Sequence, residues 1–191
     1  MAIILTNIYK AYDSTVVFED FSCHFDEGTV TCIMGTSGRG KTTLLRILAG
    51  LENVDDGKMV ANENWRRSMV FQEDRLCESL SAIANIRLVC RKPVAGSDIL
   101  EAMAAVDLDS LTANQAVRSM SGGQRRRVAI LRALIAEYDL LLLDEPFKEL
   151  DVETKEKVIH YTKEMTQGKT VVLVTHDEKE CELMGGQLIK L

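Results

Sequence analysis

The chain has 191 residues, of which 46% are hydrophobic and 27% charged, a composition typical of a soluble globular protein with one well-packed domain. Its net charge of −6 argues against sequence-independent nucleic-acid binding, which requires a basic surface. No apolar run approaches the roughly 18 residues of a membrane span, and residues 1–10 lack the features of a secretory signal. A role at a membrane would therefore require a membrane partner. The five cysteines are odd in number and lack metal-ligand spacing, so we interpret them as free thiols in a reducing cytoplasm.

The first third of the chain predicts strands alternating with a helix. The expected elements are a half-buried strand at 21–25, a buried strand at 29–34, a helix at 41–49, a turn at 55–57 and a short strand at 68–71. Gly50 follows the expected helix and would end it.

Residues 73–119 differ, because they show helical periodicity and few strand signals. Asp98 and Glu101 form a capping-box pattern that predicts the start of a helix. We therefore predict a single domain over 1–191, with an α/β core at 1–72 and 120–191 and a helical subdomain inserted between them.

The last third returns to the α/β pattern. The expected elements are helices at 121–137 and 152–166, strands at 140–143 and 170–175, then a short helix and a strand at 187–191. Uniformly apolar strands that alternate with helices predict a mostly parallel sheet covered on both faces.

The stretch G-T-S-G-R-G-K-T matches the phosphate-binding motif G-x-x-x-x-G-K-[ST], and it lies between an expected strand and an expected helix. Glycines let backbone N–H groups surround phosphate oxygens, and the helix start adds a favourable dipole. Lys41 would reach the outer phosphates, and Thr42 would offer its hydroxyl to Mg²⁺. The residues expected to bind ATP are Gly35, Thr36, Ser37, Gly38, Arg39, Gly40, Lys41, Thr42 and Thr43.

Two carboxylates follow four leucines at the end of an expected buried strand, the edge at which open α/β sheets bind ligands. Asp144 fits the strand-end carboxylate that holds Mg²⁺ in a phosphate-binding site. Glu145 would then be the general base for the attacking water. Together with the upstream motif, these residues predict a P-loop nucleotide hydrolase.

A second potential anion site begins at Ser121, where S-G-G-Q fits a capping box. Three arginines, Arg125 to Arg127, follow within one helical turn and cannot all face one way. We expect most of them to be solvated or paired with acidic surface residues.

Residues 120–134 read M-S-G-G-Q-R-R-R-V-A-I-L-R-A-L, and they lie between the phosphate-binding motif and the D-E-P at 144–146. This segment resembles the signature motif of ABC transporter ATP-binding subunits. In that family two subunits pack head to tail, and the signature of one faces the ATP on the P-loop of the other. The resemblance implies a homodimer in which Ser121, Gly122, Gly123 and Gln124 contact the partner's ATP.

Four more positions match the family. The resemblance implies that Tyr12 stacks on adenine and that Gln72 contacts Mg²⁺ and water. It implies that His176 contacts the γ-phosphate and supports catalysis. Asp151 matches the aspartate of the loop that crosses the dimer interface.

Some positions depart from the family pattern. Thr36 replaces a frequent proline, and Asp13 replaces a frequent glycine. In the interface loop, usually Ser-Ala-Leu-Asp, Lys148 and Glu149 replace the first two residues.

The resemblance implies an ATPase on the cytoplasmic face of a membrane, bound to a permease and, in an importer, to a solute-binding protein. The run 70–85 resembles the importers of nitrate, sulfonate and taurine. Alternatives are an ATPase of an efflux, lipoprotein-release or cell-division complex, and a soluble ABC ATPase of iron–sulfur assembly.

Overall fold

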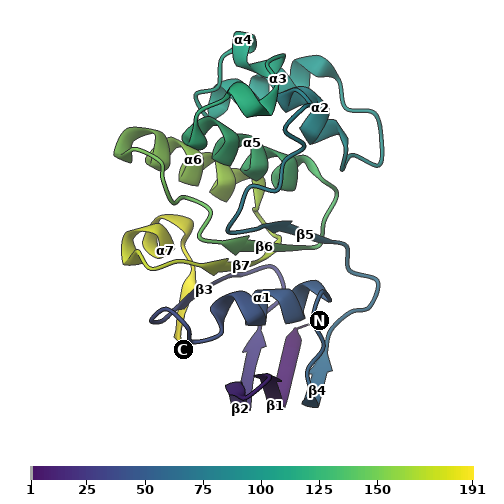
Figure 1. Ribbon diagram of the computed structural model, residues 1–191, viewed down its shortest axis with the longest axis vertical. Coiled ribbons are helices and arrows are strands. Elements are labelled where there is room, and N and C mark those ends of the chain that lie inside the picture. Colours follow the sequence, from purple (N-terminus) through teal and green to yellow (C-terminus); the bar gives the residue numbers. More distant parts are fainter. Residues whose placement is uncertain (1) are drawn as a thin grey trace.

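The computed structural model describes residues 2–191, which form two sheets and the helices that cover them (Figure 1). The strands are β1 (Ile3–Tyr12), β2 (Thr15–Phe25), β3 (Val30–Met34), β4 (Asp56–Val60), β5 (Arg67–Val70), β6 (Leu140–Asp144), β7 (Thr170–Val174) and β8 (Gln187–Lys190). The helices are α1 (Lys41–Ala49), α2 (Ala82–Arg87), α3 (Gly96–Ala105), α4 (Ser110–Ala113), α5 (Gly122–Ile135), α6 (Val152–Met165) and α7 (Glu178–Met184), with a 3₁₀ turn η1 at Val117–Ser119.

A five-stranded parallel sheet, in the order β5-β6-β7-β3-β8, forms the centre of the fold. Its strands are apolar on both faces, as β6 shows. Leu140 and Leu142 belong to the core on one face, whereas Leu141 and Leu143 belong to the core on the other. The predicted α/β class with a covered parallel sheet is confirmed.

An antiparallel sheet, in the order β2-β1-β4, lies on the far side of α1 from the parallel sheet (Figure 1). The buried face of α1 includes Leu44 and Leu45, which pack in one core with Ile3 and Leu5 of β1. Helix α1 thus lies between two sheets. Its first residue, Lys41, directly follows the loop that begins at the end of β3.

The segment between β5 and α5 contains α2, α3, α4 and η1, and its three α-helices lie above α5 in Figure 1. Helices α2 and α3 both pack against α5. The capping-box prediction for α3 is wrong: the helix begins at Gly96 after Ala95, so Asp98 lies inside the first turn.

The predicted turn at 55–57 is also wrong, because β4 begins at Asp56 and pairs with Tyr9 of β1. Gly57 has a φ of 90°, and a Cβ there would collide with the backbone of Asn7 and Ile8. Gly57 allows β4 to pack closely against β1. The prediction failed because a D-G pair is also typical of a turn.

A bidentate ion pair fixes the amino ends of β5 and β6. Arg66 donates from Nε to Asp139 Oδ2 at 2.9 Å and from Nη2 to Oδ1 at 3.0 Å. These bonds, and a further one from the Arg66 backbone, lower the pKa of Asp139 from 3.8 to about 2.

We expect Asp139→Asn to reduce the free energy of unfolding by about 1 kcal/mol at pH 7, since the pair is partly solvent-exposed. The pKa is lower in the folded chain, so the contribution is complete above the ordinary value and disappears as the pH falls through about 2. Urea unfolding at pH 7 and at decreasing pH measures this, with the exposed Asp26→Asn as control. An equal loss of stability at all pH values would contradict the electrostatic origin.

Candidate functional site

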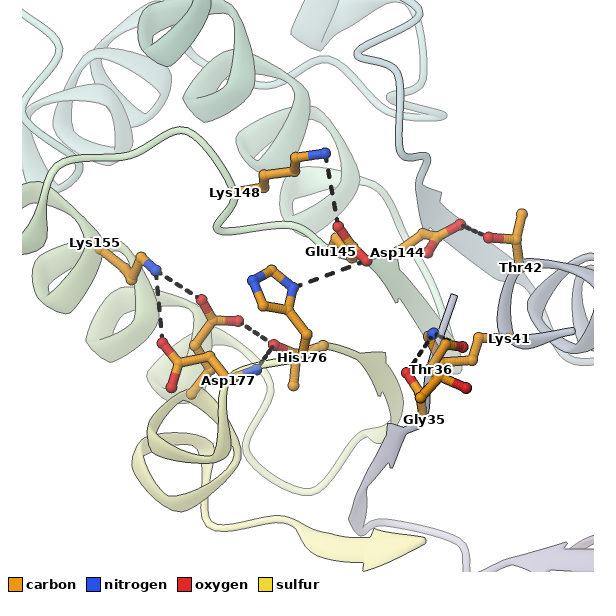
Figure 2. Close-up of polar contacts among 12 residues, drawn as sticks. Gly35, Thr36, Lys41, Thr42, Asp144, Glu145, Lys148, Lys155, His176 and Asp177 are labelled. Carbon is orange, nitrogen blue, oxygen red and sulfur yellow. Dashed lines mark hydrogen bonds and ion pairs between the residues drawn. The ribbon is translucent and has the colours of Figure 1, made fainter. Parts of the chain in front are cut away.

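A cavity of about 250 Å³ lies between the start of α1, the end of β6 and the end of β1. It is lined by Tyr12, Val17, Ser37, Gly38, Gly40, Lys41, Thr42, Thr43, Gln72, Asp144 and Glu145. The structure therefore brings the P-loop, the strand-end carboxylates, Gln72 and Tyr12 to one place. Figure 2 shows Lys41, Thr42 and the two carboxylates from this group.

The P-loop is built for an anion. Gly38 and Gly40 have φ values of 84° and 83°, a conformation that side chains with a Cβ rarely adopt. Gly40 precedes α1 and no side chain caps the helix with a hydrogen bond. Lys41 Nζ donates to the carbonyl oxygens of Gly35 at 2.8 Å and Thr36 at 3.0 Å, which holds its ammonium against the loop. Backbone amides and a positive charge at a helix start favour phosphate.

Thr42 and Asp144 join the two halves of the cavity, because Thr42 Oγ1 donates to Asp144 Oδ2 at 2.8 Å (Figure 2). Asp144 is only 2% exposed, and burial raises the pKa of its carboxyl group. Within residues 2–191 no cluster of three or more His, Cys, Asp or Glu could hold a metal. Mg²⁺ does not need such a cluster, since it commonly takes one or two protein oxygens and completes its shell with phosphate and water. The pair therefore fits a Mg²⁺–nucleotide complex.

Glu145 has a φ of 46°, which is unusual for a residue with a side chain and typical of functional turns. Its backbone N–H donates to Val174 O at 2.9 Å, which fixes the turn against β7. Its carboxylate lies 3.9 Å from His176 Nδ1 through Oε1 and 3.9 Å from Lys148 Nζ through Oε2 (Figure 2). The carboxylate thus stands at the cavity edge between two basic groups.

The backbone on either side of His176 is anchored, although its own side chain is 68% exposed. Thr175 Oγ1 donates to Glu180 Oε2 at 2.6 Å and accepts a bond from the Asp177 backbone N–H at 3.1 Å. Lys155 Nζ of α6 donates to Glu180 Oε1 at 3.0 Å. Sequence reasoning missed Glu180 and Lys155, because their partners lie on different elements. His176 approaches Glu145 but does not line the cavity.

The capping box predicted at Ser121 is present, and it lies away from the cavity described above. Ser121 Oγ accepts from the Gln124 N–H at 3.2 Å, and Gln124 Oε1 accepts from the Ser121 N–H at 2.9 Å, which confirms the capping box. None of Ser121–Gln124 lines the cavity of this chain. Asp151 also lies outside it and caps α6 by accepting a bond from the Thr154 N–H at 3.0 Å. That bond lowers the pKa of Asp151.

The expectation that most of the arginines after Gln124 are solvated or paired with acidic residues is borne out in part. Arg125 and Arg126 lie 3.9 and 3.3 Å from Asp74, but the bonds to backbone carbonyls were not expected. Arg126 is 4% exposed and donates mainly to backbone carbonyls near the cavity. Arg127 is partly buried and donates to the carbonyls of Val106 and Asp107. Both side chains serve contacts between segments distant in sequence, which helical periodicity does not report.

The family model described as ABC transporter matches residues 18–148, more than half of the chain. The chain is 35% identical, over its full length, to the aliphatic sulfonates import ATP-binding protein SsuB 1 of Nocardia farcinica, of which it covers 78%. It is 32% identical, over 98% of its length, to the spermidine/putrescine import ATP-binding protein PotA of Haemophilus influenzae. The chain spans about half the length of that relative, 54%.

Solved structures agree with the sequence comparisons. The dimeric structure of MJ0796, a bacterial ABC transporter cassette, matches with a TM-score of 0.86 and 30% identity, over 99% of this chain and 94% of that one. A dimeric post-hydrolysis state of the same cassette, bound to ADP and Pi, matches with a TM-score of 0.85 and 29% identity, over the same shares of both chains. This chain is therefore an ATP-binding, ATP-hydrolysing member of the ABC transporter family.

Proposed function

We propose that this chain is the ATPase subunit of a membrane importer of a small solute, and that it works as a homodimer. One observation carries the proposal: a single cavity unites the P-loop ammonium, the Thr42–Asp144 pair and the Glu145 carboxylate. Relatives named as import ATP-binding proteins support the direction of transport.

ATP would bind along the P-loop, from Gly35 to Thr43, with its outer phosphates at Lys41. Tyr12 lines the cavity at the end of β1 and would stack on adenine. Mg²⁺ would be held by Thr42, Gln72 and Asp144, and when bound it would neutralise phosphate charge. Gln72 lines the same cavity as both carboxylates, which suits this role.

Hydrolysis would proceed by in-line attack of water on the γ-phosphate. Glu145 would orient the water and accept its proton, because it is the cavity carboxylate not bonded to Thr42. Lys41 and His176 would stabilise negative charge on the transferred phosphoryl group. The exposed His176 side chain has room to turn toward a bound nucleotide.

The dimer explains why the chain has two anion sites. Ser121, Gly122, Gly123 and Gln124 lie outside their own chain's cavity and would close on the γ-phosphate held by the partner. Asp151 would face the partner at the same interface. ATP would hold the two subunits together, and hydrolysis would release them.

The association and release of the two subunits would be transmitted to a permease through the surface near Gln72 and the helices between β5 and α5. No helix in residues 2–191 has the length and apolarity to cross a bilayer. We propose that the chain binds the cytoplasmic face of the membrane peripherally, and that a solute-binding protein belongs to the complex.

Purification of the tagged chain from membranes of its native host tests this function. We expect a polytopic membrane protein in stoichiometric amount, and its identity and any solute-binding protein would narrow the solute. Recovery from the soluble fraction with cytosolic partners alone would refute the importer and favour an iron–sulfur assembly ATPase.

A further inference from the structure

A buried guanidinium contacts the turn that carries both cavity carboxylates. Arg126, in the second turn of α5, donates from Nε to Pro146 O at 2.8 Å. Its Nη2 donates to Glu145 O at 2.7 Å and to Asp144 O at 3.0 Å. Three successive carbonyls at the end of β6 are therefore bound by one side chain.

The remaining nitrogen of the same guanidinium contacts the segment after β5. Arg126 Nη1 donates to Phe71 O at 2.7 Å and, at longer range, to Gln72 O at 3.3 Å. It also lies 3.3 Å from Asp74 Oδ1, which balances its charge. This side chain thus connects α5 to the backbone on both sides of the cavity, at Gln72 and at Glu145.

This arrangement needs arginine. The guanidinium presents five N–H donors in a rigid planar fork, whereas lysine presents one nitrogen on a flexible stem. A buried cation is costly unless it is fully hydrogen-bonded, and here carbonyls and Asp74 provide the partners. Within residues 2–191 no buried side-chain nitrogen or oxygen lacks a partner. The rigid guanidinium therefore fixes the distance between the segment after β5 and the turn after β6.

We infer that Arg126 is a positioning residue for ATP hydrolysis, which sets Gln72 and Glu145 relative to each other and to α5. The inference rests on the proposed function of the cavity. None of the hydrogen bonds of Arg126 goes to the P-loop, where Lys41 would hold the phosphates. Loss of the Arg126 side chain should displace Glu145, the proposed base, and Gln72, while phosphate binding at the P-loop persists.

The test compares Arg126→Lys and Arg126→Gln with the wild-type chain, through kcat for ATP hydrolysis and the Kd for ATP. We expect Arg126→Gln to lower kcat by about tenfold or more, since a displacement near 1 Å at a reacting group has effects up to about 100-fold. We expect the Kd to change by less than about threefold, because the P-loop contacts remain. Arg126→Lys retains the charge and should recover part of kcat.

Arg66→Lys is the matched control. Arg66 also bridges β5 and β6, but at their amino ends, through Asp139 and away from the cavity. Urea unfolding should show a loss of stability in the Arg126 and Arg66 variants alike, whereas kcat should fall only in the Arg126 variants.

Equal kcat values in the Arg126 and Arg66 variants would overturn the inference, and so would a rise in Kd that matches the fall in kcat. If Arg126→Gln does not fold, Arg126→Lys decides the question. If both Arg126 variants fail to fold while Arg66→Lys folds, the inference is overturned, because Arg126 then serves only to stabilise the fold. A wild-type chain that neither binds nor hydrolyses ATP would instead refute the proposed function.

Discussion

Replacement of Glu145 by glutamine is expected to lower kcat for ATP hydrolysis by about 10²- to 10³-fold, with ATP binding retained. The amide has the shape of the carboxylate but cannot accept a proton from water. The left-handed turn and the Thr42–Asp144 bond do not depend on the Glu145 side chain. Single-turnover hydrolysis and ATP titration of the purified chain separate the two effects.

The same variant tests the dimer. When hydrolysis is blocked, ATP should remain between two subunits, and Glu145→Gln should accumulate as a dimer in saturating Mg-ATP. Light scattering measures this directly, with the exposed Glu63→Gln as the charge-matched control. A monomer under these conditions would count against the dimer model, and an unchanged kcat would move the general base to another residue.

The parts of the site that depend on local sequence could be predicted. The P-loop and the Ser121 capping box are short patterns that fold as their spacing predicts. The spacing of a capping box is not sufficient by itself, because the same pattern at Asp98 and Glu101 does not start α3. The apolar β6 was predictable because a strand covered on both faces needs leucine at successive positions.

Contacts between distant segments could not be predicted in this way. Arg126 bonds to residues that lie 18 to 55 positions away. Helical periodicity predicts which face of α5 carries Arg126, but it does not predict these partners. The contact between Lys148 and Glu145, at 3.9 Å, is local, since the two residues are three positions apart. It depends on the turn after β6, which the sequence did not predict. The roles of Ser121 and Asp151 toward a partner remain predictions, since they concern two chains.

Replacement of Lys41 by methionine is expected to raise the Kd for ATP by about 100-fold, because a charged contact to phosphate contributes about 1.5–3 kcal/mol and the P-loop loses the ammonium that contacts Gly35 and Thr36. Methionine keeps the apolar stem of lysine, so the fold should be retained. Isothermal titration calorimetry with ATP measures the Kd.

Lys92→Met is the matched control for charge, because Lys92 is 84% exposed and its ion pair with Glu137 lies outside the cavity lining. Lys41→Met and Glu145→Gln should affect different steps. One variant should bind ATP without hydrolysing it, and the other should fail at binding. The double variant should therefore bind as weakly as Lys41→Met and should form no dimer. An ATP affinity in Lys41→Met equal to that of Lys92→Met would mean that the backbone amides of the loop alone hold the phosphates.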